Sequence, residues 1–212
     1  IFFTGSTQVG SIVMEKAAKN LSSVGLELGG KSPCVIDNKT NLEETSRKVM
    51  WGKFVNSGQT CVAPDYVLIH NDVKDEFIKE CTNRIKEFFP NEDFATSDDY
   101  NYIITQRHAD RLHNLVEDAK AKGAQIHYGG ELKERVMYPT ILSDVSTDMK
   151  IMQEEIFGPL LPIVGLNNLD EMIDYINHFD NALATYVFSD DESFSDAIIN
   201  KTSSGGVTVN DV

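Results

Sequence analysis

The sequence predicts an α/β fold: a three-layer sandwich in which helices cover both faces of a largely parallel sheet. Short apolar runs of strand length alternate along the chain with longer segments whose apolar residues recur every three or four positions. Strands that are separated by helical crossovers pair in parallel. The chain has 212 residues, enough for one domain with a substantial core or for a small and a larger part.

The N-terminal segment predicts a strand followed by a helix. Residues 1–4 form an apolar run, and a helix over residues 6–20 would place Val9, Ile12, Val13 and Ala17 on one face. Because the chain opens directly on a strand-like run, without the pattern of a signal peptide, we expect it to begin inside a domain.

The middle of the chain continues the alternation. Asp72 is the expected N-cap of the helix that Pro90 ends, and residues 90–104 read as a surface loop. We expect strands over residues 24–28, 34–36 and 66–70, and helices over residues 41–56, 72–89 and 105–122.

The last third of the chain completes the pattern without a repeat or a flexible linker. The apolar residues of the expected helix over residues 168–177 recur at helical spacing, so this helix should pack on the sheet. We expect strands over residues 125–128, 138–142, 160–166, 184–189 and 207–209, and a second helix over residues 191–201.

Composition and charge restrict the classes of partner. The chain carries 19 Lys and Arg against 33 Asp and Glu, a net charge of −14, which disfavours binding to nucleic acid or to an anionic membrane. No apolar run approaches the roughly 20 residues of a membrane span. The three cysteines are widely spaced and form no CxxC pair, so we expect a reducing compartment, the cytoplasm. Small molecules and proteins remain as partners.

Two glycine-containing segments are candidate sites. In "FTGSTQVG" a strand runs through Gly5 into a helix that starts near Ser6, where an anion such as a phosphate is able to bind; an ordinary helix cap explains the same pattern. In "LELGGKSP" Glu27 lies among apolar residues before two glycines, and such a carboxylate is a candidate general base or simply a polar residue at a strand edge.

Cys61, in "VNSGQTCVAPD", differs from the other two cysteines. Cys34 and Cys81 occupy periodic apolar positions, whereas Cys61 lies in the break between a helix and a strand, where a thiol is able to face a cleft. A nucleophilic thiol must be accessible in this way. None of the five histidines has a motif typical of a cysteine protease, and none has metal-ligand spacing, so we predict no metal site.

The order and the residues of these segments resemble those of the NAD(P)-dependent aldehyde dehydrogenase superfamily over the whole chain. "FTGSTQVG", "LELGGKSP", "GQTCVAPDYVL", "EEIFGPLLP" and "GGVTVND" follow one another in the family's order, and "CVAPDYVL" is most similar to its class 3 branch, which acts on fatty and aromatic aldehydes. The resemblance implies that Cys61 is the nucleophile and Glu27 the general base. It also implies that the cofactor is NAD or NADP, that the substrate is a small-molecule aldehyde, of medium chain length or aromatic, and that the whole protein is a homo-oligomer.

The resemblance assigns further residues. It implies that Gly5 and Ser6 lie by the cofactor pyrophosphate, that Leu28 and Gly29 approach the nicotinamide, and that Glu155 and Phe157 hold the nicotinamide ribose. Asn210 is expected in the core near the site.

The family's chains are more than twice as long, so the resemblance implies that this chain is a fragment. Residues 1–28 then correspond to the tail of the dinucleotide-binding domain and residues 29–212 to the catalytic domain, and we expect no useful activity from the fragment alone. Two alternatives stay open: an acylating or semialdehyde dehydrogenase of the same fold, and a non-catalytic α/β paralogue.

Overall fold

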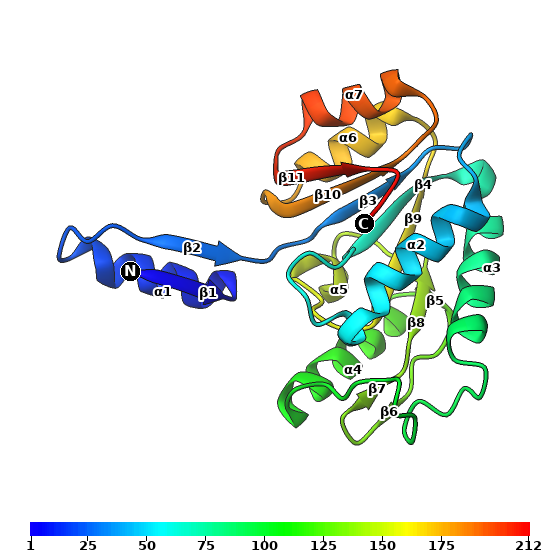
Figure 1. Ribbon diagram of the computed structural model, residues 1–212, viewed down its shortest axis with the longest axis horizontal. Helices are drawn as coiled ribbons and strands as arrows, with labels where there is room; N and C mark the ends of the chain where they lie inside the picture. The colour runs from blue at the N-terminus through cyan, green and yellow to red at the C-terminus, as the bar shows by residue number, and fades with distance from the viewer.

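The computed structural model describes all 212 residues and divides them into a body and an N-terminal arm (Figure 1). The arm is a β-α-β unit made of β1 (Phe2–Gly5), α1 (Thr7–Ala18) and β2 (Gly25–Leu28). Its two strands pair in parallel, and their carboxyl ends point toward the body (Figure 1). Four residues, 29–32, then lead from β2 into the first strand of the body.

The body contains one sheet of seven strands in the order β11-β10-β3-β4-β9-β8-β5. All neighbouring strands are parallel except β5 and β8, so the predicted largely parallel sheet is confirmed. The strands are β3 (Pro33–Ile36), β4 (Tyr66–His70), β5 (Gln125–Tyr128), β8 (Thr140–Ser143), β9 (Leu160–Leu166), β10 (Ala182–Phe188) and β11 (Ser204–Val209).

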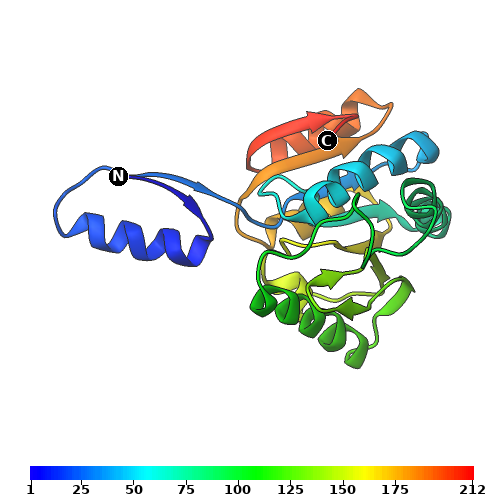
Figure 2. The same ribbon diagram turned by 60° about the horizontal axis from the view of Figure 1, so that its bottom comes forward.

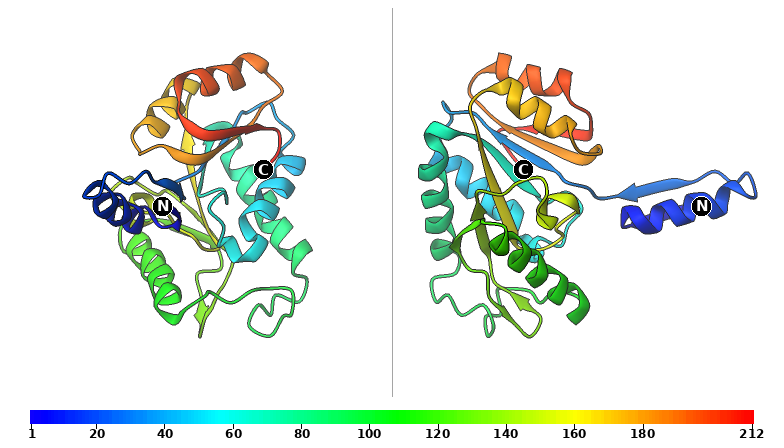
Figure 3. Two further views of the ribbon diagram at one scale, coloured as in Figure 1. Left: turned by 60° about the vertical axis from the view of Figure 1, so that its left-hand side comes forward. Right: turned by 180° about the vertical axis from the view of Figure 1, so that it is seen from behind.

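Helices cover both faces of this sheet, as the sequence predicts (Figures 2 and 3). On one face lie α2 (Leu42–Phe54) and α3 (Asn71–Phe88), whose buried residues share a core with inward side chains of β3, β4 and β9. The other face carries α4 (Gln106–Ala121), α5 (Lys150–Gln153), α6 (Leu169–Asn177) and α7 (Glu192–Lys201). No helix is both long enough and apolar enough to cross a bilayer.

Several local predictions differ from the structure. The N-cap of α3 is His70, two residues before the predicted Asp72, because the ring of His70 accepts the capping hydrogen bond from the N–H of Asp72. The short hairpin β6 (Leu132–Lys133) and β7 (Val136–Met137) and the helix α5 were not predicted. In α1, Val9 and Ile12 are exposed because the helix packs only against β1 and β2.

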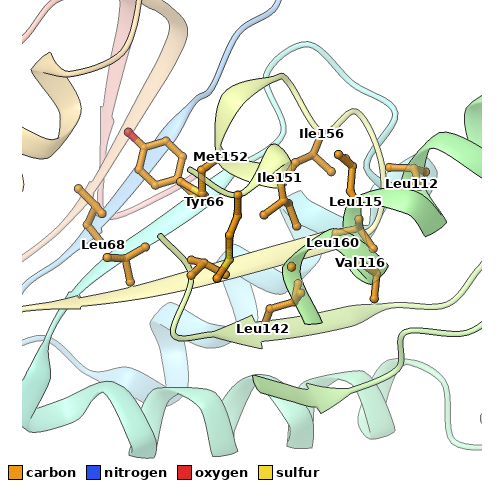
Figure 4. Close-up of a cluster of buried hydrophobic side chains, with 14 of the residues drawn as sticks. Tyr66, Leu68, Leu112, Leu115, Val116, Leu142, Ile151, Met152, Ile156 and Leu160 are labelled. Atoms are coloured by element: carbon orange, nitrogen blue, oxygen red, sulfur yellow. The ribbon is translucent and has the colours of Figure 1, made fainter. Parts of the chain in front are cut away.

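The core beneath α4 fixes the segment that carries the "EEIFGP" motif. Ile151, Met152 and Ile156 are fully buried and pack with Leu112 and Leu115 of α4 (Figure 4). Their burial removes apolar surface from water on both sides of Glu154 and Glu155, so the backbone that presents these two carboxylates is held in one place.

Candidate active site

The predicted site residues lie near the carboxyl ends of the strands in the small sheet or just before strands of the large sheet. In the arm, Gly5 and Leu28 are direct partners in the register and end their strands together. In the body, Cys61 precedes β4, Glu155 precedes β9, and Gly29 precedes β3. Ligands usually bind at the carboxyl ends of parallel strands; the candidate residues of the arm lie at such an edge, whereas those of the body lie at the amino ends of the strands.

Cys61 is the only exposed thiol. Cys34 and Cys81 are fully buried, and burial raises the pKa of both thiols far above the usual range, so these two sulfurs remain protonated and inert. The prediction that they are core residues is confirmed. The backbone N–H of Cys61 has no acceptor within the chain, so it is available to donate to an oxygen bound next to the sulfur.

The turn before Cys61 has an unusual backbone. Asn56 and Ser57 have φ of 50° and 53°, and Gly58 follows with φ of 71°. Left-handed residues normally occur singly, and each non-glycine residue there costs about 1–2 kcal/mol. At Gly58 a side chain is also impossible, because an added Cβ would overlap the carbonyl of Gly158. The "SGQTC" and "IFGP" motifs, 100 residues apart in the chain, therefore lie in backbone contact here.

A buried ion pair ties three motifs together. Lys31 of "ELGGKSP" pairs with the carboxylate of Asp65, from "CVAPDYVL", and both side chains are almost fully buried. The Lys31 ammonium also donates to the carbonyls of Ile151 (2.8 Å) and Glu154 (3.1 Å), while the other oxygen of Asp65 accepts from the N–H of Ile156 (2.9 Å). Every partner is thus satisfied, as a buried pair requires.

We expect Lys31→Met to destabilise the protein by about 3–5 kcal/mol, because it leaves the buried carboxylate of Asp65 without its ion-pair partner. Urea denaturation of the full-length protein measures the loss. Lys79→Met, at an exposed lysine without a partner, should change the stability by less than about 0.5 kcal/mol. Adding Asp65→Leu to Lys31→Met should recover part of the loss, because the buried charge is then gone although the backbone groups that the pair served stay unpaired. A double variant no more stable than the single one would contradict this explanation.

Glu155 lies against the glycines that follow β2. A Cβ on Gly29 would overlap the Glu155 carboxylate, and the N–H of Gly30 faces it. Partial burial raises the pKa of Glu155 and the nearby charge of Asp65 adds to the rise, while the Gly30 N–H, Arg111 and Lys53 oppose it. The structure therefore brings together Gly29 and Glu155, two residues to which the resemblance assigns cofactor contacts.

The other predicted residues are less closely joined. Ser6 caps α1, its hydroxyl accepting from the N–H of Val9 at 3.4 Å, so the ordinary cap is present and the anion site stays a prediction. Glu27 is exposed on β2, and no hydrogen bond or ion pair links its carboxylate to Cys61 or to any other residue. Phe157 is 40% exposed with φ of 47°.

The sequence analysis expected Asn210 in the core, and this prediction is wrong. It is exposed, and its amide exchanges two hydrogen bonds of 3.0 Å with the backbone of Ser189. Ser189 directly follows β10, and the Asn210 side chain is held there by hydrogen bonds to the backbone and not by packing in the core.

The sequence analysis did not identify three residues that lie near the site. The guanidinium of Arg111 donates to the carbonyls of Glu155 and Ile156 and pairs with Glu154 at 3.6 Å. The hydroxyl of Tyr186 donates to the carbonyl of Val62, next to Cys61. Lys53 is 1% exposed, and burial lowers its pKa to about 8. These long-range contacts leave no pattern in the local sequence.

Comparisons with known proteins agree with the resemblance. The model of the aldehyde dehydrogenase family matches residues 1–212. The mouse protein named "Aldehyde dehydrogenase family 3 member A2" is 49% identical over 214 residues, which cover 100% of this chain and 43% of that protein. The mouse "Aldehyde dehydrogenase, dimeric NADP-preferring" is 48% identical, with 46% of its length covered.

Solved structures give the same result. The substrate-bound state of AldH from Staphylococcus aureus superposes with a TM-score of 0.94 at 43% identity, over 100% of this chain and 46% of that one. Betaine aldehyde dehydrogenase from the same species, in complex with NAD+, has a TM-score of 0.90 at 29% identity, over 100% of this chain and 43% of that one. The chain therefore spans less than half the length of the curated relatives it matches.

Proposed function

Because the chain belongs to the aldehyde dehydrogenase family, we propose that the whole protein oxidises an aldehyde to a carboxylic acid with NAD(P)+ through a thioester on Cys61. The observation that carries this proposal is the contact among three of the motifs, one of which carries the single exposed thiol of the chain. The Lys31–Asp65 pair joins "ELGGKSP" to "CVAPDYVL", and the contact of Gly58 with Gly158 joins "SGQTC" to "IFGP".

The residues of the chain take part in the reaction as follows. The thiolate of Cys61 attacks the aldehyde carbon, forming a carbon–sulfur bond, and the unpaired N–H of Cys61 donates to the resulting oxyanion. A bound NAD(P)+ would supply the acceptor for the hydride that leaves this carbon. Glu27 takes a proton from the water that attacks the thioester, and the acid and the thiolate are released.

The residues present fit a dinucleotide. The paired ends of β1 and β2 place Gly5, Ser6 and Leu28 together at the N-terminus of a helix, where backbone N–H groups favour a pyrophosphate. Glu155, beside Gly29, offers two carboxylate oxygens to the hydroxyls of a ribose, with Phe157 next to it. Either NAD or NADP is proposed, since one relative is named NADP-preferring and one solved neighbour holds NAD+.

Replacing Gly29 with alanine should weaken cofactor binding, because the new methyl group would displace the Glu155 carboxylate. A hydrogen bond to a charged group is worth about 1.5–3 kcal/mol, so we expect the Kd for NAD(P)+ to rise about 10- to 100-fold. Isothermal titration of the full-length protein measures it. Gly206→Ala is the matched control, because a Cβ there meets nothing. An unchanged Kd for Gly29→Ala would remove Glu155 from the cofactor site.

We propose that residues 1–28 are the tail of the dinucleotide-binding domain and residues 29–212 the catalytic domain. The separate β-α-β arm supports this division. The rest of the cofactor domain would lie in the part of the whole protein outside this chain, so steady turnover by the 212-residue chain alone would contradict the proposal. A homo-oligomer is proposed because one relative is named dimeric, and a cytoplasmic location because all three cysteines are unpaired.

The substrate class proposed is a medium-chain or aromatic aldehyde, which the similarity to family 3 members supports. The full-length protein, assayed with hexanal, benzaldehyde and acetaldehyde, should form NAD(P)H and the carboxylic acid, and acetaldehyde should be the poorest substrate. With coenzyme A added to the same assay, formation of acyl-CoA in place of acid would favour the acylating alternative. Equally slow labelling of all three cysteines by iodoacetamide would favour a non-catalytic paralogue, whereas selective labelling of Cys61 supports an active thiol.

A further inference from the structure

The left-handed turn before Cys61 needs an external support. A run of three left-handed residues, two of them not glycine, persists only where its surroundings impose it. Cys61 lies three residues beyond Gly58, so any relaxation of this turn would move the sulfur.

That support comes from residues 100–104, part of the segment that the sequence analysis read as a surface loop. The side-chain amide of Gln59 spans the gap between the two segments: its Nε2 donates to the carbonyl of Tyr102 (3.1 Å) and its Oε1 accepts from the N–H of Ile104 (2.9 Å). The same Nε2 also donates to the carbonyl of Asn56 within the turn (3.1 Å).

A second set of contacts joins the two segments beside Gln59. The hydroxyl of Ser57 donates to the carbonyl of Asn101 at 2.7 Å, and the Asn101 amide donates to the side-chain oxygen of Asn56 at 2.9 Å. Both left-handed residues that are not glycine are therefore bound to the same stretch of chain.

Residues 100–104 are themselves anchored to the body. The hydroxyl of Tyr100 donates to the carbonyl of Met137 (2.8 Å), and the N–H of Ile103 donates to the carbonyl of Arg135 (2.7 Å). The side chain of Ile103 is 1% exposed in the core. The hairpin β6–β7 thus holds residues 100–104, which hold the turn.

We infer that residues 100–104 are a brace for the nucleophile turn, and that Gln59 is the positioning residue that transmits this support to Cys61. The inference rests on the proposed function, in which the sulfur must meet the aldehyde carbon in a fixed geometry. Gln59 touches neither substrate nor cofactor, and its effect passes through the backbone of residues 56–61. A misplacement of about 1 Å is enough to cost about 10²-fold in rate.

The test compares Gln59→Ala and Gln59→Glu with wild type in the full-length protein. Both variants should lower the rate of the first NAD(P)H burst and kcat by about 10²-fold, while the Kd for NAD(P)+ stays within about threefold. Gln59→Glu is nearly isosteric but cannot donate, so it separates the donor bonds from the volume of the side chain. Asn177→Ala, which removes an amide-to-carbonyl bond at the end of α6, is the control and should leave the rates unchanged.

Two further readouts isolate the brace. Hydrogen exchange of the peptide over residues 56–62 should become at least about tenfold faster in Gln59→Ala, with no change over α3. Asn101→Ala should cost less in the Gln59→Ala background than in wild type, because both bonds act on one contact.

A burst rate of Gln59→Ala within threefold of wild type, or unchanged exchange over residues 56–62, would overturn the inference. Near-normal rates in Gln59→Glu would overturn the role of the donor bonds. If wild type oxidises no aldehyde, the proposed function fails, while hydrogen exchange still tests the brace.

Discussion

Cys61→Ala in the full-length protein is expected to lower kcat for aldehyde oxidation by at least about 10⁴-fold, because the substitution removes the sulfur on which the proposed thioester forms, and the other two thiols of this chain are buried. The substitution removes one sulfur from an exposed loop, so stability and the Kd for NAD(P)+ should stay close to wild type. Steady-state rates of NAD(P)H formation measure the loss.

Cys34→Ala and Cys81→Ala are the matched controls. Both remove a fully buried thiol, so each should cost some stability but leave kcat within a few-fold of wild type. Activity retained in Cys61→Ala, or lost equally in all three variants, would contradict the assignment of the nucleophile.

Glu27→Gln is expected to slow steady-state turnover by about 10²- to 10⁴-fold while preserving the first burst of NAD(P)H. An amide cannot take the proton from water, so hydrolysis of the thioester fails after hydride transfer has already occurred. Stopped-flow absorbance should therefore show about one equivalent of NAD(P)H per site followed by a slow phase.

Glu15→Gln, at an exposed carboxylate on α1 of the same arm, is the control and should turn over like wild type. Loss of the burst together with the steady state in Glu27→Gln would place Glu27 before hydride transfer, in conflict with its proposed role. The structure shows no contact between Glu27 and Cys61. This experiment therefore tests directly whether the two residues act in the same reaction.

Much of the fold could be predicted because its signals are local. The apolar runs of β3, β4 and β9 and the three- and four-residue spacing in α3 and α6 are visible in single windows of sequence. The strand order of the sheet and the antiparallel pairing of β5 with β8 were not predicted, because pairing is set by contacts between distant segments.

The shortest elements could not be predicted from the sequence for a different reason. The strands β6 and β7 have two residues each and α5 has four, too few for any hydrophobic period to emerge. Likewise His70 as a helix cap departs from the usual preference for Asp, Asn, Ser or Thr.

The candidate site was predicted in its residue types but not in its supports. Gly58, Gly29 and Cys61 lie in motifs that can be read locally, whereas the partner of each depends on the fold. Lys31 and Asp65 are 34 residues apart, and Gln59 reaches Tyr102 across 43 residues. No local pattern predicts such contacts, although the lysine after the glycine pair and the glutamine two residues before Cys61 are the sequence features that correspond to them.

The central claim is that an acyl group forms on the sulfur of Cys61, and mass spectrometry after rapid acid quenching tests it most directly. Full-length Glu27→Gln is mixed with hexanal and NAD(P)+, quenched during the slow phase and digested. We predict a hexanoyl adduct on the peptide that carries Cys61 and none on the peptides that carry Cys34 or Cys81. A burst of NAD(P)H with no adduct on Cys61, or with the adduct on another residue, would contradict the account.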